Sequence, residues 1–397
     1  MEPAAPLIYD GAEEPPLCDA RERIMAEELR ADVAIVGAGI AGTGLAADLA
    51  GDFDVVLLEQ ESRPGYHSTG RSAAIFIQNY GNDVIRGLSR ASAPLFHGAD
   101  KTLFPTPLLS QRGILHISDE AGLGAYHALV DGAEGMRELT IAEALAMVPV
   151  LRADRLKAAA YEHDAQDIDV DALHQGFQRK ARAGGARLVA DAPLTRASYD
   201  AGFWTIETPK ATVRAKVLVD AAGAWADTVA RLSGVAPLGI QPMRRSMAVL
   251  PAPEGRDINR WPLFGDASET WYAKPDSGRL FVSPAEEIPV DPHDAFVDDM
   301  VLAEGLFRFE EAVDYPVTRV ERSWAGLRSF APDRTPVAGF DPTAEGFFWL
   351  AGQGGYGIQT APALSMLAGR LIRRATPPAG LEPLVEPLSP ARFRGAA

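Results

Sequence analysis

The stretch DVAIVGAGIAGTGLAADLA, residues 32–50, decides the fold class of the chain. It opens with an apolar run typical of a buried strand, continues as G-x-G-x-x-G, and ends in small and apolar residues typical of a helix. The first glycine allows a tight turn, the second lets backbone N–H groups approach a pyrophosphate, and the third permits close packing of helix and strand. The residues predicted to contact a dinucleotide here are Gly37, Gly39, Ile40, Ala41 and Gly42.

A second strand with an acidic end supports this interpretation. The apolar run Val55–Leu58 is followed by Glu59, seventeen residues after Gly42. A carboxylate at this place can accept hydrogen bonds from an adenosine ribose, which favours FAD or NAD over the 2′-phosphorylated NADP. Gln60 is a further predicted contact. A tight turn without any ligand is the alternative, but the order of strand, turn and helix and the acidic residue favour a bound dinucleotide.

Residues 63–76, RPGYHSTGRSAAIF, are polar, rich in hydroxyl groups and contain two glycines. This composition favours a loop that contacts phosphate and the cofactor ring and leads into a helix. The alternative is a surface loop with a solvated arginine. His67 is not assigned to the site, because a lone loop histidine is more often structural. The predicted cofactor contacts are Ser68, Thr69, Arg71, Ser72 and Ala73.

A second glycine-rich turn lies near the C-terminus. Residues 350–360, LAGQGGYGIQT, place four glycines within six residues between an apolar run and a helical pattern. The N-terminus of that helix carries about half a positive charge, which favours the negative charge that develops on a reduced flavin. This turn therefore selects non-covalent FAD over NAD; the alternative is a turn that merely permits close packing. The predicted contacts are Gly354, Gly355, Tyr356, Gly357, Ile358 and Gln359, with Ala222, Gly223 and Trp225 after the buried strand at 217–219.

Length and composition limit the classes of protein to which this chain can belong. At 397 residues with 47% apolar content, the chain can bury the core of one large or two interwoven domains. The net charge of −16 argues against nucleic acid and anionic membrane partners, since both are polyanions. The single cysteine and the lack of a Cys/His cluster predict no metal site and fit a reducing compartment.

The sequence also carries no sign of membrane insertion. No apolar stretch reaches the roughly 18 residues of a membrane span, and residues 1–30 do not resemble a signal peptide. We predict a cytoplasmic protein. Peripheral attachment to the inner membrane and the oligomeric state stay open.

Several longer motifs give the chain a family resemblance. They are GAGIAG, PGYHSTGRSAA, IDVDALHQGF, VLVDAAGAWAD, LGIQPMRRS, WAGLRSFAPD and GFFWLAGQGGYGIQT. Over residues 31–371 they resemble the D-amino-acid oxidase-like (DAO) family of FAD-dependent oxidoreductases, and within it the bacterial D-arginine dehydrogenases and related D-amino-acid dehydrogenases. The resemblance implies an α/β fold, α+β overall, with a glutathione-reductase-like Rossmann FAD domain and a substrate domain of mixed or antiparallel sheet.

Both domains are expected to be discontinuous. Asp169 is placed to cap a helix that runs to residue 183, and strand-like segments follow it, whereas residues 234–320 lack a βαβ rhythm and predict mixed sheet and loops. The expected segments are 1–30 for an N-terminal extension, 31–80, 150–235 and 325–375 for the FAD domain, 81–149 and 236–324 for the substrate domain, and 376–397 for a C-terminal tail.

Two arginines are candidates for binding a substrate carboxylate. Arg245 in MRRS and Arg328 in GLRSF are flanked by small or apolar residues, and a buried arginine needs a paired anion. Each alone could be a structural ion pair. The resemblance implies that both hold the carboxylate of an amino-acid-like substrate and that Gly326 and Arg328 also border FAD. It further implies phenol donors at Tyr272 and Tyr80, a backbone acceptor for the amine at Gly355, and a pocket border at Gln359.

Two positions depart from the arginine-using relatives. Those relatives carry a histidine and a glutamate where this chain has Ile75 and Ile114. A cationic side chain needs such polar partners, because a buried unpaired cation costs several kcal/mol. We therefore expect a neutral substrate side chain, apolar or bulky, and poor activity on basic D-amino acids. Ile77, Leu263 and Gly265 are predicted to complete the pocket, with the glycine adding room.

The resemblance implies oxidative deamination of a D-amino acid. The Cα hydrogen passes as hydride to flavin N5, and the imino acid hydrolyses to a 2-oxo acid and ammonia. If the amine binds neutral, positioning suffices and no protein base is required. Oxygen or a quinone as electron acceptor stays open. The alternatives are oxidation of a secondary amine or a 2-hydroxy acid, a flavin-binding protein without turnover, and an NAD-dependent dehydrogenase with a single Rossmann unit.

Overall fold

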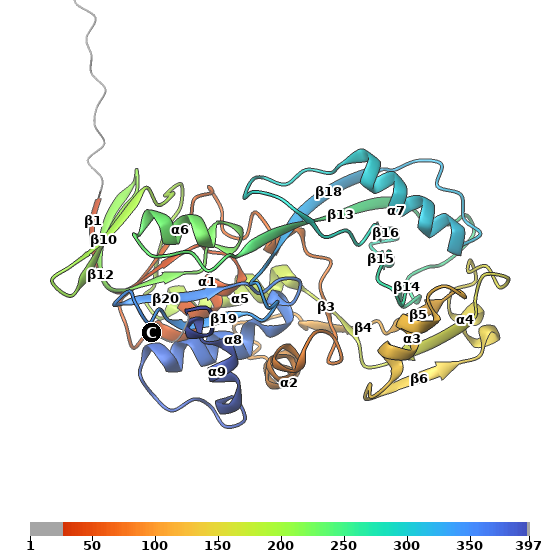
Figure 1. Ribbon diagram of the computed structural model, residues 1–397, viewed down its shortest axis with the longest axis horizontal. Coiled ribbons are helices and arrows are strands. Elements are labelled where there is room, and N and C mark those ends of the chain that lie inside the picture. The colour runs from red at the N-terminus through yellow and green to blue at the C-terminus, as the bar shows by residue number, and fades with distance from the viewer. Residues whose placement is uncertain (1–26, 395–397) are drawn as a thin grey trace, which may run out of the picture.

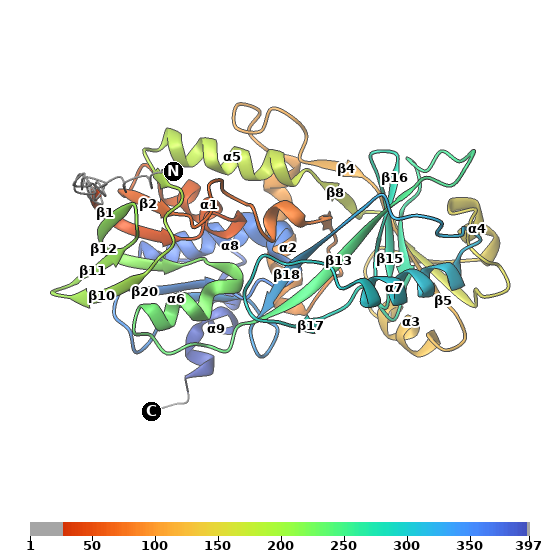
Figure 2. The ribbon, with the colours of Figure 1, turned by 90° about the horizontal axis from the view of Figure 1, so that it is seen from above.

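The computed structural model describes residues 27–394 of the chain. Most of the predicted N-terminal extension and the last three residues of the predicted tail lie outside this range. The first strand already begins at Glu27, so residues 27–30, assigned to the extension, belong to a sheet. Figure 1 shows two lobes joined by the long strands β13 (Gln241–Pro251) and β18 (Arg322–Phe330), and Figure 2 shows the same strands from above.

The first lobe is built on a mainly parallel sheet. Its order is β9–β2–β1–β12–β20–β19, and the hairpin β10–β11 lies beside the first half of β12. All neighbours pair in parallel except at β19 and at the hairpin. The strands are β1 Glu27–Val36, β2 Val55–Leu58, β9 Arg187–Val189, β10 Arg196–Asp200, β11 Phe203–Glu207, β12 Ala211–Asp220, β19 Val337–Phe340 and β20 Phe347–Ala351.

Both faces of this sheet are buried, which explains its continuous apolar strands. Successive side chains of a strand point to opposite faces. In β1, Val33 and Ile35 belong to one core cluster, whereas Ala34 and Val36 belong to another on the opposite face. Figure 1 shows α6 above the sheet and α8 below it. The helices of this lobe are α1 Ile40–Leu49, α2 Asp83–His97, α5 Val170–Ala183, α6 Ala226–Leu232, α8 Gly357–Ile372 and α9 Val385–Leu388.

The second lobe is built on a mixed sheet. Its order is β18–β13–β16–β15–β14–β5–β7–β6, with β17 also paired to β13. One face packs against α7, and the other carries Arg245, Tyr272 and Ile114. The remaining elements of this lobe are β5 Ile114–Ser118, β6 Met136–Leu139, β7 Ala158–Glu162, β14 Leu263–Asp266, β15 Tyr272–Asp276, β16 Arg279–Ser283, β17 Ile288–Pro289, α3 Leu123–Val130, α4 Ile141–Met147 and α7 Asp299–Ala312.

A small sheet lies between the lobes in the order β3–β8–β4. Its strands are β3 Ile75–Phe76, β4 Leu109–Gln111 and β8 Gln166–Ile168. The predicted passage from the polar loop into a helix is therefore wrong. The loop instead forms a single 3₁₀ turn, Thr69–Arg71, and then enters strand β3.

The fold class is confirmed, but several segment boundaries differ, including β18, which lies mostly in the predicted FAD segment and pairs in the sheet of the second lobe. Helix α2 falls in a segment predicted for the substrate domain, but Leu88 and Phe96 bury its apolar stripe in the core of the first lobe. Strand β7 falls in a segment predicted for the FAD domain, but it pairs with β5 and β6 of the second lobe. The predicted cap at Asp169 is confirmed, since its carboxylate accepts a hydrogen bond from Ala172 N at the start of α5.

Candidate active site

One cavity lies at the carboxyl ends of the central parallel strands. Because β12 pairs with β1 on one side and with β20 on the other, the turns that follow all three strands meet at one edge. Gly37 and Gly39 line the cavity after β1, Ala222 after β12, and Gly354 and Gly355 after β20. The two glycine turns are thus brought to one site. Of the predicted cofactor residues, Gly42, Tyr356 and Gln359 do not line it.

The first glycine turn leaves no space for side chains. Gly37 has a φ of +99°, and a Cβ there would lie 2.5 Å from the Ala221 carbonyl oxygen. A Cβ on Gly42 would lie 1.9 Å from the Gly37 carbonyl oxygen. Gly42 therefore permits the close packing of α1 on β1 that the motif predicted, without touching the cavity.

Glu59 lines the cavity and holds the glycine turn. Its carboxylate accepts hydrogen bonds from Ala38 N at 2.8 Å and Glu61 N at 3.0 Å. Burial raises the pKa of Glu59, and the two backbone donors partly offset this effect. Each oxygen retains a lone pair, so the carboxylate can still accept hydrogen bonds from a ribose.

His174 in α5 contacts the same residue, Ala38, through its carbonyl group. Its Nε2–H donates to the Ala38 carbonyl oxygen at 3.0 Å, and Gln178 lies 3.2 Å from its Nδ1. Burial lowers the pKa of His174, which favours the neutral ring. This histidine lies in the motif IDVDALHQGF, but its sequence context did not predict a role for it.

The loop after β2 connects the two lobes. Thr69 Oγ1 accepts a hydrogen bond from Ile40 N at 3.0 Å, next to the glycine turn. Ser68 Oγ donates to the Leu327 carbonyl oxygen of β18 at 2.6 Å. Both side chains line the cavity, so the predicted cofactor loop also joins the cavity to the second lobe.

Arg71 lines the cavity, and protein groups occupy three of its five N–H donors. The guanidinium donates to the carbonyl oxygens of Ala295 and Ala325, both at 2.9 Å, and forms an ion pair with Asp294. The sequence predicted a phosphate-contacting arginine. In the structure this side chain bridges the two lobes, and the sequence carried no signal for its distant partners.

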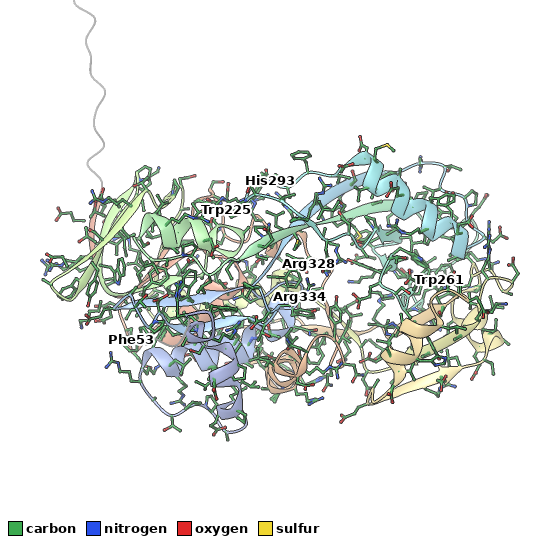
Figure 3. The ribbon with its side chains drawn as sticks, viewed as in Figure 1. Phe53, Trp225, Trp261, His293, Arg328 and Arg334 are labelled. Carbon is green, nitrogen blue, oxygen red and sulfur yellow. The ribbon has the colours of Figure 1, made fainter. Side chains whose placement is uncertain are left out.

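Two partly buried guanidiniums lie on one face of β13 and β18. Arg245 is opposite Gly326, and Arg328 is opposite Met243, so both side chains point to the same face. Figure 3 shows Arg328 between Trp225 of the first lobe and Trp261 of the second. Both arginines line the cavity, and a Cβ on Gly355 would lie 2.9 Å from Arg328 Nη1. The second glycine turn and the arginine pair are therefore in contact.

The charges of the arginine pair are incompletely balanced. Arg245 Nη2 lies 3.3 Å from Glu287 Oε1, and its buried Nε has no hydrogen-bond partner among residues 27–394. Burial, and then the like charge of Arg328, lowers the pKa of Arg245. Arg328 forms no ion pair within the same part of the chain. Burial alone would lower its pKa, but the nearby Tyr80, Tyr272 and Glu287 raise it overall. Two partly buried guanidiniums with incomplete partners can accommodate an anion such as a carboxylate.

The two predicted phenols lie near this pair. Tyr272 on β15 lines the cavity, and the Tyr80 ring packs edge-on against the Tyr356 ring with centroids 4.9 Å apart. Both phenols are close enough to contribute to the pKa values of Arg245 and Arg328. The structure thus brings Arg245, Arg328, Tyr80 and Tyr272 together.

The predicted side-chain pocket forms one apolar cluster. It contains Ile75, Ile77, Ile114, Leu263 and Ala165 packed against Tyr272. Of these residues only Tyr272 lines the cavity, so the cluster adjoins the cavity through this side chain.

Gly265 does not add the room that was predicted. A Cβ there would lie 2.7 Å from the Trp271 carbonyl oxygen and 2.9 Å from the Tyr272 Cβ. The space beside this glycine is filled by the neighbouring strand. Gly265 therefore permits close pairing of β14 and β15.

Gln359 is buried in α8, and both ends of its amide are occupied. Oε1 accepts a hydrogen bond from Ile77 N at 3.0 Å, and Nε2 donates to Ser89 Oγ at 2.9 Å. The structure places Gln359 beside the residues of the site but not on the cavity wall.

Further residues at the site were not predicted from the sequence, although Tyr66 and Trp324 lie in motifs that carry the family resemblance. Tyr66, Met247 and Trp324 line the cavity. Glu162 lies opposite Ile114 in the β5–β7 pair, and its Oε1 accepts a hydrogen bond from Asn79 at 3.0 Å. Burial raises the pKa of Glu162 to about 7.

The sequence predicts neither a metal site nor a membrane span. Within residues 27–394, no three His, Cys, Asp or Glu side chains lie together in an arrangement that could hold a metal ion. None of their helices is long and apolar enough to cross a membrane.

Comparison with known sequences identifies similar proteins. A sequence model of the family described as "FAD dependent oxidoreductase" (DAO) matches residues 32–371. Glycine oxidase of Geobacillus kaustophilus (strain HTA426) is 25% identical over 364 residues, which cover 87% of this chain and 93% of that enzyme. Human mitochondrial dimethylglycine dehydrogenase is 25% identical over 404 residues, which cover 93% of this chain and 45% of that longer enzyme.

Solved structures have the same fold. The crystal structure of glycine oxidase from Geobacillus kaustophilus gives a TM-score of 0.77 at 24% identity, covering 90% of this chain and 98% of that one. L-proline dehydrogenase from P. horikoshii gives a TM-score of 0.78 at 21% identity, covering 93% of this chain and 99% of that one. These relatives are named for glycine, dimethylglycine and proline. The comparisons support the predicted family resemblance but not the narrower likeness to D-arginine dehydrogenases.

Proposed function

Because the chain belongs to the DAO family of FAD-dependent oxidoreductases, we propose that it oxidises the C–N bond of a neutral α-amino acid. FAD is its cofactor, and the chemistry is the oxidation of an amine. The cavity fits this cofactor, since it has bare-backbone turns from two ends of the chain and a carboxylate suited to a ribose. The finer proposal concerns the substrate: a D-amino acid with a neutral side chain.

The arginine pair is the observation that carries this proposal. Two like charges share a buried site, and one of them keeps an unpartnered buried Nε. A carboxylate is the anion that two guanidiniums bind with charge-assisted hydrogen bonds. Because Gly355 contacts Arg328, a carboxylate held here lies beside the turn that receives the flavin.

Each residue of the site has a positioning role in this proposal. Arg245 and Arg328 bind the substrate carboxylate, and the hydroxyls of Tyr80 and Tyr272 donate to it. The Gly355 carbonyl oxygen accepts a hydrogen bond from the neutral amine, so no side chain has to remove a proton. Bound FAD supplies the hydride acceptor. Fixing the α-carbon by its two polar substituents provides the orientation on which the rate depends.

The apolar cluster supports a neutral side chain. Ile75, Ile77, Ile114 and Leu263 offer no partner to a guanidinium or an ammonium group. Glu162, opposite Ile114 in the β5–β7 pair, already accepts a hydrogen bond from Asn79, and burial raises its pKa to about 7.

A secondary amine is the second candidate substrate. Similar proteins are named for L-proline, a secondary amine, and dimethylglycine, a tertiary amine. Such substrates need the same carboxylate site. Glycine derivatives carry no side chain and therefore do not need the apolar cluster, which does not line the cavity apart from Tyr272.

Anaerobic reduction of the bound flavin tests the proposal. The purified holoprotein is mixed with glycine, N-methylglycine, both proline enantiomers, D- and L-amino acids of each side-chain class, and 2-hydroxy acids. We expect bleaching of the flavin by neutral D-amino acids or by N-alkylated glycines, and little by D-arginine or D-lysine. Preference for a basic D-amino acid contradicts the proposed pocket. A flavin that no compound bleaches indicates a flavin-binding protein without turnover.

The variant Arg328→Met tests whether Arg328 binds the substrate carboxylate. Methionine keeps much of the side-chain volume and removes the charge. We expect KM to rise and kcat/KM to fall by about two orders of magnitude, since a charge-assisted pair is worth about 2–3 kcal/mol. The flavin should remain bound. An unchanged kcat/KM would remove Arg328 from the substrate site.

A further inference from the structure

The buried amide of Gln359 connects three segments that are distant in sequence. Gln359 is the third residue of α8, whose first two residues, Gly357 and Ile358, line the cavity. Its side chain bonds Ile77, 282 residues away, and Ser89, 270 residues away. Gln359 is only 3% exposed, so water cannot take the place of either hydrogen-bond partner.

The chemistry of the two partners fixes the orientation of the amide. A backbone N–H can only donate, so the Ile77 N–H requires the carbonyl end of Gln359. Ser89 Oγ donates its own proton to the Ile85 carbonyl oxygen of α2 at 2.8 Å. That hydroxyl is therefore left as an acceptor for the Gln359 Nε2–H group. Each bond in the series fixes the direction of the next.

The segment held by Gln359 carries residues of the proposed substrate site. Ile75 and Ile77 belong to the apolar cluster, and Tyr80, three residues further on, lies beside the arginine pair. The same segment is held elsewhere through Asn79, which donates to Glu162, and Asn82, which donates to Thr335. Strand β3 also pairs with β8 at Ile75 and Phe76, and the Ile77 contact holds the chain directly after this strand.

We propose that Ser89 and Gln359 act as positioning residues that hold residues 75–80 against the substrate. This inference rests on the proposed function. Ser89 orients the Gln359 amide, Gln359 holds the Ile77 backbone, and Ile77 places the apolar wall and the Tyr80 phenol. Gln359, predicted from the sequence to border the pocket, then affects substrate binding through this segment and not by its own contact.

The interface between α2 and α8 provides a matched control. Ser92 is fully buried one helical turn beyond Ser89, and its Oγ donates to the Leu88 carbonyl oxygen at 2.8 Å. Ser92 Oγ also accepts a hydrogen bond from Ala363 N of α8 at 3.1 Å. Ser92 therefore joins the same two helices through the same kind of bond, but it does not reach residues 75–80.

The experiment compares Ser89→Ala, Gln359→Met and Ser92→Ala with the unmodified holoprotein. The affinity for benzoate is measured by its perturbation of the oxidised flavin spectrum, which requires no turnover. KM and kcat are measured with the best substrate of the panel, and FAD affinity and melting temperature are measured for every variant. We expect Ser89→Ala and Gln359→Met to raise both the benzoate Kd and KM about tenfold, with kcat within about threefold and FAD affinity unchanged.

Ser92→Ala should lower the melting temperature about as much as Ser89→Ala and leave the benzoate Kd and KM unchanged. Equal benzoate affinities for Ser89→Ala and Ser92→Ala would overturn the proposal. So would a Gln359→Met variant that loses FAD or lowers kcat at constant KM, because the amide would then act directly on the cofactor or the reacting atoms. If no amine reduces the flavin, the proposed function fails, while the benzoate measurement still tests the positioning role.

Discussion

At the scale of single residues, Glu162 shows how the fold changes the chemistry of a side chain. It is 4% exposed, and burial raises its pKa to about 7, with the nearby Asp164 carboxylate adding to the effect. The hydrogen bond from Asn79 and the charge of Arg86 oppose the shift. At neutral pH this carboxyl is therefore only partly ionised beside the apolar cluster.

Glu162 makes the stability of the protein depend on pH. In the unfolded chain the carboxyl loses its proton near pH 4.5, whereas in the folded protein it does so near pH 7. Between these values the folded state binds the extra proton, so the contribution of Glu162 to stability falls as pH rises. We expect Glu162→Gln to gain on the order of 2 to 3 kcal/mol relative to the unmodified protein between about pH 5 and pH 8.

Urea unfolding of both proteins at the two pH values measures this difference. The glutamine can still accept the hydrogen bond from Asn79, so the comparison isolates the ionisation. A stability difference that stays constant across this pH range would show that the carboxyl titrates normally.

At the scale of elements, the β1–α1 turn depends on glycine for packing as well as for cofactor access. Gly39 lines the cavity, whereas Gly42 faces the carbonyl of Gly37. The same motif thus combines a residue that exposes backbone to FAD with one that lets the helix approach the strand.

Gly42→Ala should therefore destabilise the protein without touching the cavity. The new Cβ would lie 1.9 Å from a backbone oxygen, so α1 would have to move away from β1. We expect a loss of about 3 kcal/mol of unfolding free energy, measured by urea denaturation, and weaker FAD binding.

Gly124→Ala in α3 is the control for this substitution. Gly124 is a helical glycine, and a Cβ added to it would have no atom within 4 Å, so the alanine should stabilise the protein by about 0.5 kcal/mol or more. If both alanines have the same small effect, the close packing at Gly42 does not limit stability.

At the scale of the whole molecule, the cavity proposed to bind FAD is lined by residues of both lobes. The glycine turns belong to the first lobe, whereas Arg245 and Tyr272 belong to the sheet of the second. Arg71 adds bonds to Asp294 and Ala295 across the boundary. A ligand in this cavity contacts both lobes and stabilises their arrangement.

Removal of FAD should accordingly destabilise both lobes together. At a hundredfold excess over its Kd, FAD should raise the free energy of unfolding by about 2.7 kcal/mol through binding to the folded state alone. We expect calorimetry of the FAD-free protein to show a single transition that moves to higher temperature as FAD is added. Two transitions, of which only one responds to FAD, would show that the lobes unfold independently.

The sequence by itself determined the elements whose signals are local. The run Asp32 to Gly42 defines a strand, a turn and the start of a helix within eleven residues, and the structure contains them in that order. The cap of α5 at Asp169 is local in the same sense. Hydrogen bonds and steric limits between near neighbours in the chain govern these features, so short patterns suffice to predict them.

Only the tertiary structure decided which distant groups meet. Arg71 has its partners more than 220 residues away, Gln359 is bonded to Ile77 and Ser89, and Glu162 lies beside Ile114 because β5 and β7 pair. The lack of room at Gly265 follows in the same way from the strand paired beside it. Such contacts depend on sheet order and register, which no local pattern encodes, because the free energy of each contact is gained only after the chain has closed a long loop.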